Sequence, residues 1–169
     1  LLKEGFSEDE FVKKPIDYGW NFTSAELNKT DNVLRENGCE GTGYIVFVLG
    51  TTWESKNYPV ENWIKLTELL SQEGRKIVCV GDSKDKEVLK QIKDKVGGNI
   101  VVDLIGKTSL RAMIMVLSKS AVVVGGDTGP LHIAASLNVN TVALMNPTSV
   151  EKFAPLNIKG VALTADYDC

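Results

Sequence analysis

The residues best suited to chemistry lie in short loops, each of which follows an apolar run. The first such loop, residues 50–59, carries two hydroxyls and an ammonium within six residues, on Thr51, Thr52 and Lys56. Hydroxyls and lysine are common phosphate ligands, with lysine acting as a point charge. The loop has neither the G-x-x-x-x-G-K-[ST] nor the G-x-G-x-x-G pattern, so it indicates another kind of phosphate contact or a solvated polar loop.

The strongest anion-binding signal lies in residues 125–132, Gly-Gly-Asp-Thr-Gly-Pro-Leu-His. The two glycines allow a ligand to come close to the backbone, and Pro130 suits the first turn of a helix. Free N–H groups and the helix dipole favour a phosphate at such a helix N-terminus. Thr128 adds a hydroxyl. His132, the only histidine in the chain, can donate a hydrogen bond to a phosphate oxygen or serve a purely structural role.

Two further loops carry weaker signals. Residues 81–87 place carboxylates after a strand, where they can accept hydrogen bonds from ribose hydroxyls or complement the dipole of the next helix. Residues 106–109 open another helix, which Thr108 or Ser109 would cap, and a backbone contact to a base stays open. No nucleophile elbow, paired-carboxylate motif or metal cluster accompanies these loops, which argues against hydrolysis by this chain.

Alternating strands and helices must position these loops. Apolar runs predict strands at residues 44–49, 76–80, 99–102, 121–124, 141–144 and 161–163. Amphipathic stretches predict helices at residues 61–72, 85–96, 109–118 and 130–137. In the helix at 109–118, the spacing predicts one apolar face made of Leu110, Met113, Ile114 and Leu117.

The strands are apolar on both faces, which is typical of a parallel sheet covered by helices on both sides. Because strand and helix alternate, the sequence predicts an α/β fold with a doubly wound, Rossmann-like parallel sheet. Such sheets bind ligands outside the carboxyl ends of their strands, near the switch in strand order. We therefore expect the functional residues in the loops that follow the strands.

The first 43 residues differ from the rest, because they are polar and show no strand pattern. They are predicted to be a linker or interdomain segment with one helix, capped by Ser24 and ending at Asn37 before Gly38. Residues 44–169 are predicted to form the Rossmann-like domain. The chain begins with Leu1 and has no signal-peptide pattern, and we expect it to be a piece of a longer protein.

Composition excludes several classes of protein. A length of 169 residues fits one domain, and no run of about 18 apolar residues could form a membrane-spanning helix. The net charge of -3 argues against non-specific nucleic-acid binding as the main activity. The three cysteines, Cys39, Cys79 and Cys169, are too few and too scattered for a disulfide framework or a zinc site.

At its loops the sequence resembles glycosyltransferase family 9, the ADP-heptose:lipopolysaccharide heptosyltransferases. The strongest match is residues 126–135, Gly-Asp-Thr-Gly-Pro-Leu-His-Ile-Ala-Ala, followed by residues 142–144 and 146–148. The second is residues 51–56, Thr-Thr-Trp-Glu-Ser-Lys, with Tyr-Pro at 58–59 just before a helix. Both motifs occur in the right order, and the resemblance covers about residues 44–155. Asn146 departs from the family, where a glycine is common before Pro-Thr.

The resemblance implies a GT-B enzyme, in which two Rossmann-like domains enclose a cleft, and this chain would be the carboxy-terminal half that holds the nucleotide-sugar. Asp127 would face the donor sugar hydroxyls, Asp85 the ribose and Thr108 the adenine. The implied diphosphate ligands are Thr51, Thr52 and Lys56 on one loop and Thr128, Gly129 and His132 on the other.

The implied reaction is an inverting transfer of heptose from ADP-heptose to the lipopolysaccharide inner core, without a metal or further cofactor. The catalytic base is expected on an amino-terminal domain outside this chain, so no catalytic residue is predicted here. The expected partners are the nucleotide-sugar donor and, through that domain, the lipopolysaccharide acceptor, and not nucleic acid. A cytoplasmic location is expected, with peripheral contact to the inner face of the inner membrane. The alternatives are a GT-B-like nucleotide-sugar epimerase and a non-catalytic nucleotide-binding module.

Overall fold

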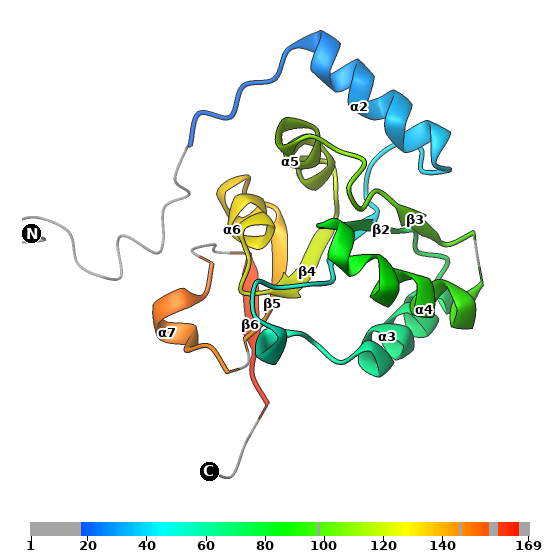
Figure 1. Ribbon diagram of the computed structural model, residues 1–169. Helices are drawn as coiled ribbons and strands as arrows, with labels where there is room; N and C mark the ends of the chain where they lie inside the picture. Colours follow the sequence, from blue (N-terminus) through cyan, green and yellow to red (C-terminus); the bar gives the residue numbers. More distant parts are fainter. Residues whose placement is uncertain (1–17, 98, 146, 156–158, 166–169) are drawn as a thin grey trace, which may run out of the picture.

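The computed structural model describes residues 18–97, 99–145, 147–155 and 159–165, and a parallel sheet forms its centre (Figure 1). The strands are β1 (Ile45–Val48), β2 (Ile77–Val80), β3 (Val101–Asp103), β4 (Val122–Gly126), β5 (Asn140–Leu144) and β6 (Gly160–Leu163). All neighbouring strands pair in parallel, in the order β3-β2-β1-β4-β5-β6. The predicted doubly wound α/β fold is confirmed, including the short strand near residue 161.

Strand residues alternate between two hydrophobic cores. In β1, Val46 and Val48 enter one core, while Ile45 and Phe47 enter the other. β-branched and aromatic residues favour strands because they pack well on a pleated surface. The central strands are buried on both faces, as the continuous apolar runs predict.

Helices cover both faces of the sheet. They are α2 (Ser24–Glu36), α3 (Val60–Gln72), α4 (Lys86–Val96), α5 (Leu110–Ser118), α6 (Gly129–Ser136) and α7 (Val150–Phe153), with short 3₁₀ turns η1 (Glu54–Lys56) and η2 (Ser83–Asp85). Side chains of α3 and α4 complete one core, and side chains of α2, α5 and α6 complete the other. The helices predicted from periodicity are confirmed, whereas α7 and the two 3₁₀ turns were not expected.

Two local predictions were wrong. The residue that caps α2 is Thr23 rather than Ser24: its hydroxyl accepts the Glu26 N–H at 3.3 Å, and its own N–H donates to the Glu26 carboxylate at 2.9 Å. Leu110 is 64% exposed instead of facing the core. Because α5 packs against both α2 and α6, it buries the consecutive residues 114–117 rather than a single stripe, while Leu110 at its first position stays exposed.

The strand order places a switch point between β1 and β4. From β1 the chain continues to β2 on one side, and from β4 it continues to β5 on the other. The loops after β1 and β4 therefore diverge and leave a crevice at the carboxyl ends of the strands. A Cβ at Gly126 would lie 2.7 Å from Cγ2 of Thr51, so glycine is needed there for the two loops to approach each other.

Candidate functional site

One carboxylate joins the two loops at the switch point. Lys56, at the end of η1, places its Nζ 3.0 Å from Oδ2 of Asp127, which directly follows β4. His132, in the first turns of α6, places Nε2 3.3 Å from the other oxygen, Oδ1. The structure thus brings together three predicted site residues, and we refer to Lys56, Asp127 and His132 as the switch-point cluster.

Asp127 is the partly buried centre of this cluster. Its side chain is 16% exposed, compared with 26% for Lys56 and 45% for His132. Burial is the largest single influence on the pKa of Asp127 and acts to raise it, but the hydrogen bonds and charges of Lys56 and His132 together outweigh burial and hold this pKa below its ordinary value. Asp127 is therefore an anion at neutral pH.

The N-terminus of α6 lies open beside the cluster. Its N-cap residue is Thr128, not Asp127, and no side chain in the described part of the chain makes a capping hydrogen bond there. The Thr128 hydroxyl instead donates to the Gly126 carbonyl at 3.3 Å. A Cβ at Gly129 would find nothing within 4 Å. Pro130 has no N–H, and the Leu131 N–H donates to the Thr128 carbonyl at 3.1 Å. The Gly129 N–H is therefore the group of the first turn that is left for an anion.

The two threonines after β1 lie in different environments. Thr51 is buried, and its hydroxyl lies 2.6 Å from the Trp53 carbonyl and 3.0 Å from Oδ1 of Asn57, whereas Thr52 is exposed. The Thr51 N–H also donates to Oδ1 of Asn57, at 2.9 Å. The hydroxyl of Thr51 therefore shapes the loop in the unliganded chain.

Sequence reasoning missed two residues that support this loop. Asn57 accepts hydrogen bonds from the N–H and the hydroxyl of Thr51, and Lys84 donates from Nζ to the Thr51 carbonyl at 2.9 Å. Lys84 thus brings a second ammonium to the loop after β1. The only signal for it was its place in a polar loop after β2, where several lysines and acids looked equivalent.

Asp85 lies between the ends of β1 and β2. Its side chain is buried, and Oδ2 accepts the Asp82 N–H at 3.0 Å. Burial raises the pKa of Asp85. A Cβ at Gly50 would lie only 1.9 Å from Oδ1 of Asp85, so the carboxylate fills the space left by that glycine.

Thr108 lies beside a separate cavity of about 320 Å³ between α2 and α5. Its neighbour Ser109 caps α5 by accepting the Ala112 N–H at 3.2 Å, which confirms one of the two caps proposed for that helix.

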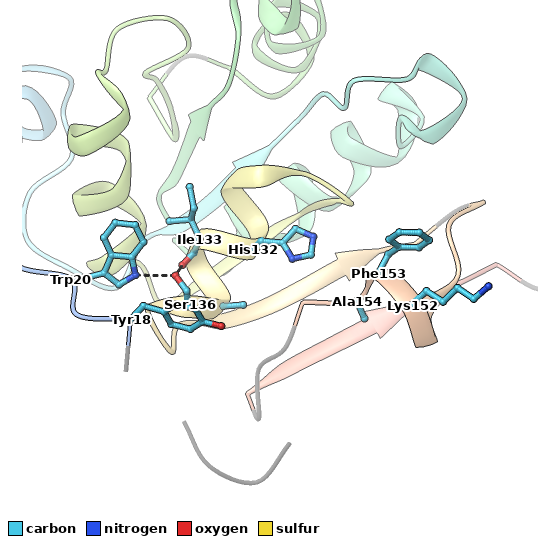
Figure 2. A pocket seen from close by; sticks show the side chains of 9 residues that line it. Tyr18, Trp20, His132, Ile133, Ser136, Lys152, Phe153 and Ala154 are labelled. Atoms are coloured by element: carbon cyan, nitrogen blue, oxygen red, sulfur yellow. Dashed lines mark hydrogen bonds between the residues drawn. The ribbon is translucent and has the colours of Figure 1, made fainter. Parts of the chain in front are cut away.

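A second cavity adjoins the switch-point cluster on the outer side of α6. It measures about 470 Å³, and His132 forms part of its wall. Figure 2 shows Tyr18 and Trp20 along one side of α6 and Phe153 of α7 on the other, with the Trp20 indole donating to the Ser136 hydroxyl at 2.9 Å. His132 therefore lies between a charged cluster and a mostly apolar pocket.

The described part of the chain holds neither a metal-binding cluster nor a membrane-spanning helix. Within the described ranges, no group of three or more His, Cys, Asp or Glu side chains could hold a metal ion. No helix in the same part of the chain is both long and apolar enough to span a membrane.

Comparison with known proteins gives a consistent result. The family model of glycosyltransferase family 9 (heptosyltransferase) matches residues 7–169. Lipopolysaccharide heptosyltransferase 1 of Pseudomonas aeruginosa is 30% identical over 130 residues, which are 76% of this chain and 36% of that protein. The chain spans about a third of the length of this relative and of a Haemophilus influenzae one.

Solved structures agree with this match. The ADP-heptose LPS heptosyltransferase II of Escherichia coli superposes with a TM-score of 0.74 at 25% identity, covering 85% of this chain and 44% of that one. An E. coli heptosyltransferase solved with ADP gives 0.70 at 25% identity, covering 81% and 42%. A UDP-GlcNAc 2-epimerase of Methanocaldococcus jannaschii shares the fold alone, with a TM-score of 0.56 at 14% identity, covering 82% and 39%.

Proposed function

The chain belongs to glycosyltransferase family 9, the heptosyltransferases, and on that premise we propose that it is the donor-binding half of an enzyme that transfers heptose from ADP-heptose to the lipopolysaccharide inner core. The observation that carries the proposal is the convergence of Lys56, Asp127 and His132 beside the open N-terminus of α6. A nucleotide-sugar is held mainly through its diphosphate, and this is the place in the described chain best suited to one.

The geometry suits stabilisation of a leaving diphosphate. As the sugar–oxygen bond breaks, negative charge grows on the diphosphate. Donors that are already aimed at this charge lower the barrier, and such stabilisation is often the largest single catalytic effect. Lys56 would supply a charge, Thr128 a hydroxyl, and the backbone of α6 the Gly129 N–H together with the helix dipole. Gly129 leaves the space that the phosphates would need.

The remaining donor contacts follow the family pattern and stay predictions. Asp127 is assigned to sugar hydroxyls, Asp85 to the ribose and Thr108 to the adenine side. An ADP-type donor is supported by the E. coli relatives that were solved with ADP and with ADP-2-deoxy-2-fluoro heptose. Because the chain spans about a third of its relatives' length, the catalytic base and the acceptor contacts are assigned to another part of the full enzyme. A cytoplasmic location with peripheral membrane contact also stays a prediction.

Two alternatives have less support. A nucleotide-sugar epimerase is favoured only by a shared fold at low identity. A non-catalytic nucleotide-binding module would show the same ADP site, and transfer by the full-length protein distinguishes it from an enzyme.

Replacement of Lys56 tests the proposed diphosphate site. Lys56→Ala should weaken ADP binding by about 1.5–3 kcal/mol, because a charge-assisted hydrogen bond is lost, and should leave adenosine binding nearly unchanged. Calorimetric titration with both ligands measures the difference. Lys65→Ala removes an exposed lysine of α3 and is the matched control. Equal losses for ADP and adenosine would contradict a diphosphate contact.

A further inference from the structure

Two of the groups assigned to the diphosphate, Lys56 and His132, are paired with Asp127. Both oxygens of Asp127 are engaged, Oδ2 with Lys56 Nζ at 3.0 Å and Oδ1 with His132 Nε2 at 3.3 Å. The two partners come from different loops, and Lys56 lies 71 residues before Asp127 in sequence. The Asp127 carboxylate therefore contacts the same two side chains that the phosphate oxygens of a ligand would contact.

Such a pairing has two opposite effects on an incoming anion. It fixes the flexible side chain of Lys56 beside α6, and a group that is already ordered loses less freedom when the ligand arrives. The same carboxylate competes with the phosphates for both partners and repels them. In a partly desolvated site such as this one, repulsion between like charges is stronger than in bulk water.

We propose that Asp127 is a positioning residue that holds Lys56 and His132 beside the N-terminus of α6 until a diphosphate takes both over. The inference rests on the proposed function. Transfer of the two partners to the phosphates frees the Asp127 oxygens, which can then accept hydrogen bonds from hydroxyls of the donor sugar. The observed pairing and a sugar-facing role thus describe two states of the same carboxylate.

The exchange has a consequence for His132. Its Nε2 lies 3.3 Å from Oδ1 of Asp127, and the ring also forms part of the wall of the adjoining pocket. When a phosphate oxygen replaces the Asp127 oxygen beside Nε2, the environment of the imidazole changes.

Because the chain has a single histidine, its imidazole can be followed without ambiguity by nitrogen NMR. The imidazole nitrogen resonances of His132 should shift when ADP or pyrophosphate is added, and should not shift with adenosine. ADP binding without any response of His132 would overturn the positioning role and leave the proposed function standing. Failure of both ADP and pyrophosphate to bind would overturn the proposed function and this inference together.

Asp127→Asn tests whether the Asp127 carboxylate competes with the phosphates, as proposed, or only supports the structure of the site. The amide oxygen of asparagine can still accept a hydrogen bond from Lys56, whereas the charge that repels the phosphates is gone. The variant should therefore bind ADP and pyrophosphate about two- to fivefold more tightly, with adenosine binding unchanged. Asp103→Asn is the matched control, because Asp103 also ends a strand and pairs with a lysine, Lys107, at 3.0 Å, and it should not change ADP affinity. Weaker ADP and pyrophosphate binding by Asp127→Asn, at unchanged melting temperature, would overturn the proposal.

A second variant keeps the proposal testable if Asp127→Asn fails to fold. His132→Ala removes the imidazole, so ADP and pyrophosphate should bind more weakly while adenosine binding stays unchanged. Calorimetric titration measures the three affinities. Unchanged affinity of His132→Ala for ADP and pyrophosphate would contradict the assigned exchange.

Discussion

At the scale of single residues, Gly129 allows ligand contact and fold stability to be separated. A Cβ added there would meet nothing within 4 Å in the unliganded chain, and alanine is favoured over glycine within a helix by about 0.5–1 kcal/mol. Gly129→Ala should therefore keep or slightly raise the melting temperature. It should weaken ADP binding, because the new methyl group would project into the space assigned to the phosphates.

Gly126→Ala provides the contrast. Its Cβ would lie 2.7 Å from Cγ2 of Thr51, so the loop after β1 would have to shift. This variant should lower both the melting temperature and the ADP affinity. If Gly129→Ala bound ADP as tightly as the unchanged chain, the phosphates would not lie over the first turn of α6.

The sequence placed Lys56, Asp127 and His132 at the carboxyl ends of strands, because each follows an apolar run. It did not reveal that Asp127 binds both partners. That contact depends on which strands are neighbours and on the side-chain conformations of Lys56 and Asp127, which are 71 residues apart in sequence. Nor did it reveal that the Thr51 hydroxyl is turned toward Trp53 and Asn57. In the sequence, Asn57 was one polar loop residue among several.

At the scale of elements, α2 is attached to α5 by a charged contact. Glu26 accepts hydrogen bonds from the Arg111 guanidinium, with Nη2 3.1 Å from Oε2, and it also completes the capping box with Thr23. The hydrogen bond from Arg111, followed by that from the Thr23 N–H, lowers the pKa of Glu26 from 4.5 to about 2. Lys119 and Asp31 form a second ion pair between α2 and the end of α5.

The lowered pKa of Glu26 predicts a specific pH dependence. Because the pKa is lower in the folded than in the unfolded chain, the stabilisation by the Glu26 carboxylate is complete above pH 4.5 and is lost as the pH falls toward 2. Glu26→Gln should lower the melting temperature at pH 7, since glutamine keeps the capping box but not the charge. The difference between the two proteins should shrink steadily below pH 4.5. A difference that stayed constant down to pH 3 would contradict an ionic contact.

The prediction of helices succeeded where the helix is long enough to show its period, and it failed where the helix is short. The helices α3 to α5 were predicted because their apolar residues recur over two turns or more, and α6 because Pro130 follows the glycines that end a strand. α7 has four residues, and the turns η1 and η2 have three each, so no period could be detected in them. The exposed Leu110 shows the other limit, because periodicity alone could not tell that α5 would bury the consecutive residues 114–117 and leave Leu110 in solvent.

At the scale of the whole molecule, the strand order explains why two distant motifs act together. The alternating pattern predicted a doubly wound sheet, but β4 becomes the neighbour of β1 only through the crossover that follows β3. That neighbourhood joins the loops at residues 50–59 and 125–132 into one site. The family motifs indicated both loops, and the sheet topology gives the physical reason for their convergence.

The whole chain should bind donor but not transfer sugar on its own. In the described site, the carboxylate nearest the anion position is Asp127, and it is held by Lys56 and His132. It is therefore unsuited to remove a proton from an acceptor hydroxyl in this state. An assay with ADP-heptose and a lipopolysaccharide acceptor should detect no transfer by the chain, whereas the full-length enzyme should be active. Measurable turnover by the chain alone would contradict the assignment of the base to another part of the protein.

The central claim is that the loops after β1 and β4 together form a diphosphate site, and a titration with ADP followed through the backbone amide spectrum tests it most directly. We predict saturable shifts at residues 51–56 and 127–132, reproduced by pyrophosphate in the same loops and absent with adenosine. Saturable shifts confined to other regions, such as the pocket beside Trp20 and Phe153, or no shifts at all, would contradict the account.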